Sequence, residues 1–317
     1  MTQAEAFVGI DVAKHELVVH VHPGGDGWRV ENSATGLRDL VAKLRPLARK
    51  YTVRIGFEAS GGYERPLAIL LEKKGFEAYM LDPARVRSFA RAQGKRAKTD
   101  PLDAAMIARA LATWHADLTP WRNDPDARRL AERVKLRDLL VAQAIQTGNL
   151  LETIADPVSQ RMIRAQVAGL KARIARLDKI IAELIATQPV LRQRAKLLQS
   201  APGIGPIIAA TLLAHMPELG RMTGKQAAAL AGVAPFDRQS GTSARPGRCQ
   251  GGRPQVRRAL YLAALSIMRT KKSYLAACGL TLRDKGRPFK VAIIATARKL
   301  LVALNAMIKN DQAFAPA

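Results

Sequence analysis

The sequence is poor in acidic, aromatic and cysteine residues, and each shortage excludes a class of protein. Lys and Arg total 51 but Asp and Glu only 26, which gives a formal charge of +25. Such an excess favours a nucleic-acid partner, because each phosphate that is neutralised releases counterions. An aromatic content of 5% argues against rows of side chains that stack on single-stranded bases. Two cysteines, Cys249 and Cys278, provide neither a disulfide framework nor a Cys-x-x-Cys zinc site.

Long apolar segments are also missing. The opening MTQAEAFVGID lacks the basic and apolar regions of a secretory signal. The apolar stretch 206–216 is too short to span a bilayer, and 291–308 is interrupted by Arg298 and Lys299. Hydrophobic residues nevertheless make up 48% of the chain, which indicates packed cores rather than disorder. We therefore expect a cytoplasmic protein that binds nucleic acid and has no membrane partner.

Charge and hydrophobic periodicity predict three domains. Residues 1–120 carry a net charge of +4, residues 121–195 of +6 and residues 196–317 of +15. Because most of the positive charge lies in the last segment, we expect it to form the main DNA-contacting surface.

Strands and helices alternate in the first domain. Two runs rich in β-branched residues, 7–12 and 17–21, are separated by a short polar turn and predict a hairpin. The pattern that follows predicts a mixed sheet with helices on its faces. The further strands are expected at 28–32, 53–57 and 77–81, and the helices near 37–47, 63–73 and 100–111.

The middle segment is nearly free of glycine and carries an apolar stripe close to a heptad repeat. This pattern predicts a helical hairpin or coiled coil, broken near Pro157. A spacer arm and an oligomerisation arm are both compatible with it, and we expect the stripe to mediate self-association. The stripe consists of Leu170, Ile174, Leu177, Ile180, Ile181, Leu184 and Ile185.

The C-terminal domain is expected to be mostly helical, with glycine-rich breaks. Gly203-Ile204-Gly205 resembles a helix-hairpin-helix turn, whose backbone N–H groups would bind a DNA phosphate; an ordinary helix–helix turn is the alternative. We expect helices at 206–215, 256–268 and 289–308 and a basic, glycine-rich loop at 237–254.

Ser240 stands at the start of this basic loop. Neighbouring arginines could neutralise a phosphate and leave the hydroxyl free to attack it. A plain Ser-Gly turn is the alternative interpretation, and Ser243 is a nearby competitor as nucleophile. The candidate nucleic-acid-binding residues are Gly203, Gly205, Arg238, Arg245, Arg248, Arg253, Arg257 and Arg258.

Four acids could form a metal site. Asp11 interrupts an apolar strand, and Glu58 ends a strand just before a turn of small residues. Asp100 and Asp103 share one face at the start of a helix, where they would also serve as ordinary capping or first-turn acids. Taken together, two strand carboxylates and two helix-start carboxylates could converge on two Mg²⁺ ions.

Five motifs in order, FVGIDVAK, GFEASGGY, AKTDPLDA, APGIGP and LAGVAPFDRQSG, resemble the DEDD-type insertion-sequence transposases. These are bridge-RNA-guided serine recombinases related to pilin-gene DNA invertases. The resemblance implies an N-terminal RuvC-like (RNase H-like) domain, a coiled-coil arm and a C-terminal transposase domain with a helix-hairpin-helix. It places the family's acidic tetrad on Asp11, Glu58, Asp100 and Asp103, and its nucleophile on Ser240.

The same resemblance implies partners and a reaction. The partners would be target and donor DNA, a structured guide RNA and further copies of the chain, as a dimer and as a tetramer in the synaptic complex of a bacterial cytoplasm. The reaction would be insertion and excision of a mobile element, with Mg²⁺ at the carboxylates and a covalent serine–DNA intermediate.

Three other functions compete with this interpretation. An actin-like kinase could use Gly9-Ile10-Asp11 as a phosphate-binding hairpin, but a second strand that ends in an Asp-x-Gly turn and a glycine-rich adenosine site are not found later in the chain. A non-catalytic nucleic-acid-binding protein would not need the acids. A junction-resolving nuclease would use the same acids with water as nucleophile, and would form no covalent adduct through Ser240.

Overall fold

The computed structural model describes residues 3–315 apart from 95–99, 241–242 and 272, and it leaves the side chains of 236–246 undescribed. The chain divides into two compact units, Met1–Asn123 and Asp124–Ala317. The helices of the expected middle segment belong to the second unit, where they share a core with the C-terminal helices.

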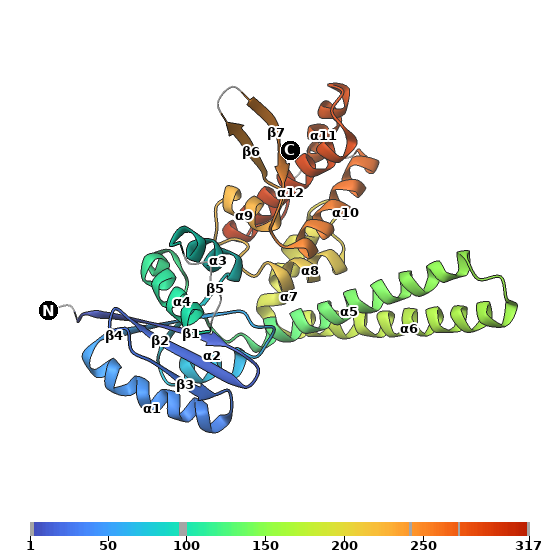
Figure 1. Cartoon of the computed structure of the whole chain (residues 1–317). Coiled ribbons are helices and arrows are strands. Elements are labelled where there is room, and N and C mark those ends of the chain that lie inside the picture. The colour runs from blue at the N-terminus through green and yellow to red at the C-terminus, as the bar shows by residue number, and fades with distance from the viewer. Residues whose placement is uncertain (1–2, 95–99, 241–242, 272, 316–317) are drawn as a thin grey trace. The chain divides into compact units, whose positions relative to one another are not determined.

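The first unit contains the expected mixed sheet (Figure 1). Its five strands are arranged in the order β3-β2-β1-β4-β5. The pairs β3–β2 and β2–β1 are antiparallel, and the pairs β1–β4 and β4–β5 are parallel. The hairpin and the later strands are thus confirmed. The strands are β1 (Glu5–Val12), β2 (Glu16–His22), β3 (Gly27–Glu31), β4 (Thr52–Glu58) and β5 (Glu77–Leu81).

Helices cover both faces of the sheet, as the alternation in β1 requires. Val8 and Ile10 face the layer formed by the first two helices, whereas Phe7 faces the layer formed by the next two. The third of these helices was not expected, although Asp82 caps it by accepting a hydrogen bond from the Ala84 N–H. The four helices are α1 (Ala34–Lys50), α2 (Arg65–Lys73), α3 (Pro83–Ala92) and α4 (Asp100–Trp114), followed by a 3₁₀ turn at His115–Asp117.

The second unit begins with a long helical hairpin and continues as a helical bundle (Figure 1). The break expected near Pro157 falls between the two hairpin helices. The helices of the unit are α5 (Pro125–Asn149), α6 (Pro157–Thr187), α7 (Pro189–Ser200), α8 (Pro206–His215), α9 (Gly224–Ala231), α10 (Pro254–Thr270), α11 (Tyr274–Asp284) and α12 (Phe289–Asn310), with a 3₁₀ turn at Leu150–Glu152.

The apolar stripe of α6 packs within the chain. Leu177, Ile181 and Leu184 are buried in one cluster with Leu130 and Val134 of α5. The base of the helical hairpin is therefore part of the hydrophobic core of the second unit, so these stripe residues are already covered by the chain's own helices.

The prediction of a loop at 237–254 is wrong for most of that range. The structure has β6 (Pro235–Ser240) and β7 (Ser243–Cys249) there, paired as an antiparallel hairpin with Ser240 opposite Ser243. Strand pairing depends on backbone hydrogen bonds, which a sequence without apolar alternation does not reveal.

Helix α12 is long and apolar enough to cross a membrane by length and composition, and is the one such helix among the described residues. Half of its apolar window is buried inside the protein. Leu300, Leu301 and Leu304 are fully buried in the core of the second unit, so α12 has the packing of a core helix.

Candidate active site

Asp11 and Glu58 lie side by side at the ends of neighbouring strands. Strands β1 and β4 are parallel, and their last matched pair is Ile10 with Phe57, one residue before the two acids. Because side chains alternate along a strand, Asp11 shares its face with Gly9, and Glu58 shares the same face with Gly56. Both side chains are partly buried.

Two glycines bring α4 onto this face. A Cβ at Gly9 would overlap the backbone of Ala104 and Ala108, and a Cβ at Gly56 would lie 3.2 Å from Leu111. Only glycine leaves room for so close an approach of helix to strand. Asp103 immediately precedes Ala104, so the close packing brings its carboxylate to the end of the sheet that carries the two strand acids.

The negative charges of Asp11 and Asp103 act on Glu58. The pKa of Glu58 is raised from 4.5 to about 7, first by burial and then by these two charges. The guanidinium of Arg87 on α3 acts in the opposite direction, and Asp82 adds to the rise. Loss of the Glu58 proton is therefore disfavoured until the pH is close to neutral.

Asp100 and Asp103 share the first turn of α4. Asp100 is exposed, whereas Asp103 is partly buried. Of the two, Asp103 is the one whose negative charge is among the main causes of the raised pKa of Glu58.

The three acids suit a hard divalent cation by their chemistry. Carboxylate oxygens are the preferred donors for Mg²⁺, and a cation would relieve the repulsion that raises the pKa of Glu58. Within the described ranges, however, no three His, Cys, Asp or Glu side chains are close enough together to hold a metal ion. The carboxylates would have to draw together around it.

The loop after Glu58 is fixed by a buried acid that the sequence analysis missed. The carboxylate of Glu64, 8% exposed, accepts hydrogen bonds from the Ser60 N–H, the Ser60 hydroxyl and the Gly62 N–H at 2.8–3.0 Å. Burial alone would raise its pKa, but these hydrogen bonds outweigh burial and lower it. The signal was an acid at the N-cap of a helix, two residues after Gly61-Gly62, both of which have positive φ.

The glycines of the expected helix-hairpin-helix turn differ in role. Gly203 has a φ of 75°, and a Cβ there would lie 2.6 Å from the carbonyl oxygen of Ala263 in α10. This close packing favours the ordinary helix–helix turn. Gly205 is exposed at the N-cap of α8, and no side chain caps that end of the helix.

Two of the candidate arginines hold the protein together. Arg253 forms a two-pronged ion pair with Glu218, with both N···O distances at 2.7 Å, and donates to the carbonyl of His215 at 2.7 Å. Arg257 donates to the carbonyls of Gly232 and Gly251. The donors of both Nη atoms of Arg253 are engaged within the chain, which argues against phosphate binding, whereas Arg257 uses only Nη1.

The remaining candidates lie around the β-hairpin and on α10. Arg248 and Arg258 are exposed. Arg238 and Arg245 face each other across the paired strands and Ser240 ends β6, but the side chains of all three lie outside the described residues.

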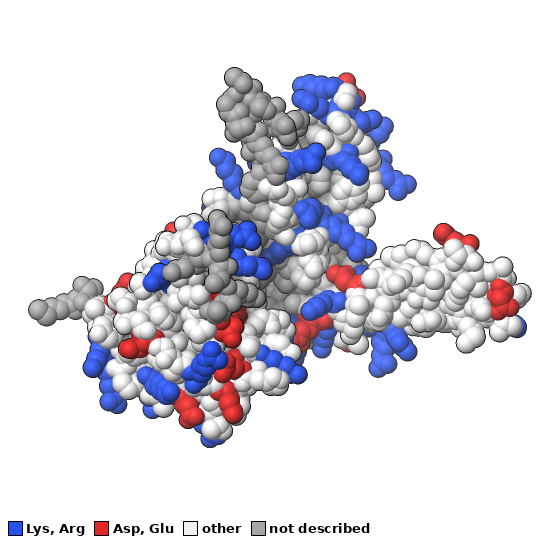
Figure 2. Space-filling model, viewed as in Figure 1, with Lys and Arg blue, Asp and Glu red and all other residues white. Residues whose placement is uncertain are grey.

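The C-terminal positive charge is almost entirely uncompensated. In the described part of 196–317, the pair of Arg253 with Glu218 is the only ion pair, although the segment carries a net +15. Lys and Arg side chains gather over α10 and α11 in Figure 2. A surface of this kind suits a polyanion.

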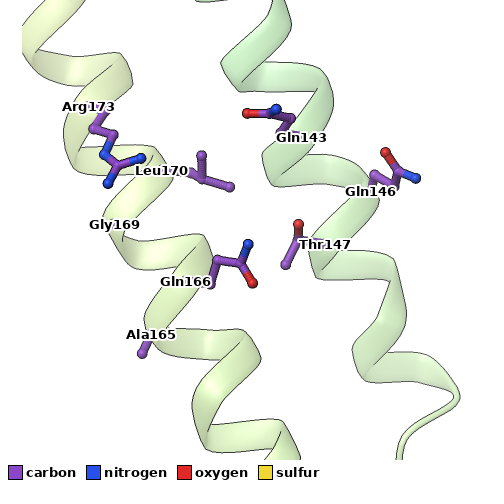
Figure 3. Close-up of a pocket in the computed structure, with 8 residues that line it drawn as sticks. All are labelled: Gln143, Gln146, Thr147, Ala165, Gln166, Gly169, Leu170 and Arg173. Atoms are coloured by element: carbon purple, nitrogen blue, oxygen red, sulfur yellow. The ribbon is translucent and has the colours of Figure 1, made fainter.

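A cavity of about 510 Å³ opens between α5 and α6 (Figure 3). Leu170 and Gln166 of α6 and Thr147 of α5 point into the space between the helices. Arg173 is the only charged residue in its lining, so the cavity has no groups for acid, base or metal catalysis.

Comparison with known proteins defines the class. Residues 8–158 match a DEDD-type family model described as "Transposase", and residues 195–278 match a second model described as "Transposase IS116/IS110/IS902 family". Two separate stretches of the chain are therefore similar to transposase families.

Full-length relatives narrow the class to a family. The pilin gene-inverting proteins of Moraxella bovis and Moraxella lacunata are each 27% identical over 319 residues, covering 98% of both chains. The putative transposase y4rJ of Sinorhizobium fredii is 26% identical over 362 residues, 94% of this chain and 90% of its own. Together the matches support an IS110-type transposase, a family with transposase or DNA-invertase function.

Proposed function

We propose that the protein is a site-specific DNA recombinase that cleaves and rejoins strands through a covalent link to Ser240. The observation that supports the catalytic part is the pairing of β1 with β4, which ends one residue before Asp11 and Glu58, together with the close packing of α4, which carries Asp103, on Gly9. The raised pKa of Glu58 agrees with this arrangement. A protein of charge +25 gains nothing in DNA affinity from three acids at one place. They fit a role in chemistry.

The acids would hold the metal. Asp11, Glu58 and Asp103 would provide the ligands, with Asp100 as the fourth member that the resemblance adds. When bound, Mg²⁺ would polarise the scissile phosphate, as paired metal ions do in phosphodiester chemistry. The mixed sheet and the position of the acids at its strand ends support a RuvC-like domain.

Ser240 would be the nucleophile. Its Oγ forms a bond to the phosphorus, the bond from phosphorus to the leaving DNA oxygen breaks, and the serine proton ends on that oxygen as a free hydroxyl. A hydroxyl of the partner strand then reverses the step, so the phosphoester energy is kept and no nucleotide cofactor is needed. Ser243 lies opposite Ser240 in the hairpin and is the matched alternative.

The partners are part of the proposal. Target and donor DNA would be selected by a structured RNA, and the exchange would take place in a dimer that pairs into a tetramer. The full-length similarity to pilin gene-inverting proteins makes inversion of a DNA segment an alternative outcome of the same strand exchange.

Covalent trapping tests this mechanism. A nicked suicide duplex spanning one end of the element, incubated with the protein, Mg²⁺ and the RNA transcribed beside the gene, should give a protein–DNA adduct with wild type and with Ser243→Ala. Ser240→Ala should give none, since one hydroxyl is lost. Asp11→Asn should also give none, and its Mg²⁺ affinity should fall, whereas that of Ser240→Ala should not.

Other results would assign another function. An adduct that persists in Ser240→Ala and disappears in Ser243→Ala would move the nucleophile to Ser243. Cleavage without an adduct, unaffected by Ser240→Ala but abolished by Asp11→Asn, would identify a nuclease that uses water. An adduct that forms equally well without the RNA would remove RNA guidance from the proposal.

A further inference from the structure

The outer face of α1 carries a row of arginines. Arg38, Arg45 and Arg49 follow one another at intervals of seven and four residues, and all three are exposed. At 3.6 residues per turn these intervals place them within about 20° of a single line along the helix. The row is about 16 Å long at 1.5 Å per residue.

A lysine from the neighbouring helix widens the row into a basic groove. Lys74 is exposed at the C-cap of α2, and it lies across from Arg38 and Arg45. The groove has a volume of about 200 Å³ and an apolar floor, and its lining consists of Arg38, Val41, Ala42, Arg45, Leu70 and Lys74. In Figure 2 several Lys and Arg side chains lie on the part of the surface that α1 forms, with some acidic side chains between them.

These cations are not used to stabilise the fold. Among the described residues, Arg38, Arg45, Arg49 and Lys74 form no ion pair. Arg38 only donates to neutral acceptors of its own helix, at 3.2 and 3.3 Å. The one acid of α1, Asp39, lines a different groove. Three cations without an ion pair line the groove, and Arg49 extends the row beyond it. Such an arrangement suits an extended polyanion.

This groove lies on the side of the sheet that faces away from the acids. Helices α1 and α2 pack on the face of β1 that carries Val8 and Ile10, whereas Asp11 shares the opposite face with Gly9, on which α4 lies. A helix with its side chains is about 10–12 Å across. A whole sheet and a helix layer therefore separate the basic groove from the carboxylates, and the phosphates that it binds are not those that react.

We propose that the α1–α2 groove binds the sugar-phosphate backbone of double-stranded DNA outside the reacting site. The proposal rests on the proposed function in one respect: the DNA substrate of a recombinase extends past the site at which its strands are cut and joined. The groove lining contains no aromatic side chain, which disfavours single strands. A row of about 16 Å extends past several phosphates of one strand, which follow each other every 3.4 Å along the duplex axis. The contact is with phosphates and is independent of sequence.

The salt dependence of DNA binding tests the groove. The triple variant Arg38→Gln, Arg45→Gln, Lys74→Gln in the full chain removes three charges. Its matched control is Arg161→Gln, Arg164→Gln, Lys171→Gln, which removes three exposed charges from α6. Affinity for a plain DNA duplex is measured by fluorescence anisotropy between about 50 and 200 mM salt.

Each lost phosphate contact should lower the slope of log affinity against log salt by about 0.9, so the groove variant should lose about 2.7. Raising the salt from about 50 to 200 mM weakens the DNA binding of both proteins. The loss of affinity should be roughly 40-fold smaller for the groove variant than for wild type. The control should keep the wild-type slope. An unchanged slope in the groove variant, or an equal loss in the control, would overturn the proposal.

Two further measurements separate this proposal from its neighbours. With a duplex RNA of equal length, a loss of slope larger than with DNA would assign the groove to RNA instead. On a short suicide duplex the groove variant should still form the serine adduct, whereas Ser240→Ala should lose the adduct and keep the DNA slope. Failure of the groove and failure of the catalytic assignment thus give different results. Near-wild-type tryptophan emission confirms that the groove variant is folded.

Discussion

Replacing Glu58 by glutamine should stabilise the metal-free first unit at neutral and alkaline pH. The pKa of Glu58 is raised from 4.5 to about 7 by burial and by the charges of Asp11 and Asp103. An acid with a raised pKa binds a proton more readily in the folded protein than in the unfolded chain. The contribution of Glu58 to the stability of the folded protein is therefore largest at low pH, and it falls as the pH rises from 4.5 to about 7.

The magnitude follows from the width of that window. A rise from 4.5 to about 7 corresponds to roughly 3 kcal/mol at 1.36 kcal/mol per pKa unit. Glu58 is only partly buried, so solvent screening reduces the expected effect to about 1–2 kcal/mol. Glutamine has the same shape and no charge. We therefore expect Glu58→Gln to unfold with a free energy about 1–2 kcal/mol larger than wild type at pH 8, and with no gain at pH 4.5.

The positions of the tryptophans make this measurable on the full chain. All of them, Trp28, Trp114 and Trp121, lie in the first unit. Urea unfolding followed by tryptophan emission therefore reports this unit without a contribution from the second one. The midpoints of wild type and Glu58→Gln should diverge as the pH is raised from 4.5 to 8.

An exposed glutamate of the same unit provides the control. Glu31→Gln removes the same charge away from the acid cluster and should leave the pH dependence of wild type in place. Adding Mg²⁺ at pH 8 should stabilise wild type more than Glu58→Gln, because the ion binds the ionised acids. Equal stability of wild type and Glu58→Gln at pH 8, or the same gain at both pH values, would refute the picture of three coupled carboxylates.

Two substitutions test the packing that supports the site and the arm. Gly9→Ala should destabilise the first unit by several kcal/mol, since the added Cβ would overlap the α4 backbone. Urea unfolding measures this change. A loss of less than about 0.5 kcal/mol would mean that α4 does not lie on Gly9. Ile181→Lys should destabilise the second unit by about 3 kcal/mol or more, because Ile181 is 2% exposed in the core of that unit. Circular-dichroism melting measures this loss. A variant that stays folded but has a lower mass on light scattering would instead assign the stripe to self-association.

The first unit was largely predictable because its elements carry local signals. Strands β1 and β2 alternate around a short turn, and α4 begins with the acid–proline pair Asp100-Pro101. The convergence of Asp11 and Glu58 also followed from strand position. That the charge of Asp103 acts on Glu58 more strongly than the charge of Asp100 could not be read from the sequence, because the placement of α4 depends on close packing against Gly9.

The second unit was less predictable because its structure depends on distant pairing. The stripe of α6 has the period of a self-associating helix, yet Ile181 packs against α5 of the same chain. The β6–β7 hairpin is formed by backbone pairing in a segment without apolar alternation. Arg253 looked like a phosphate ligand among its basic neighbours, and only the structure shows its two-pronged pair with Glu218.

The two sides of the first unit's sheet differ in charge, with acids on the side of α4 and cations on the side of α1 and α2. Asp11, Glu58 and Asp103 lie where α4 meets the strand ends, and burial together with the charges of the other two acids raises the pKa of Glu58 to about 7. Such a cluster also repels DNA, so phosphate can approach it only with a cation between them. The α1–α2 face carries cations without ion pairs and would bind phosphate without a metal if the groove takes DNA as we propose. On that proposal the acid face would gain affinity for DNA only with a cation bound, while the basic face would bind the duplex whether or not the cation is present.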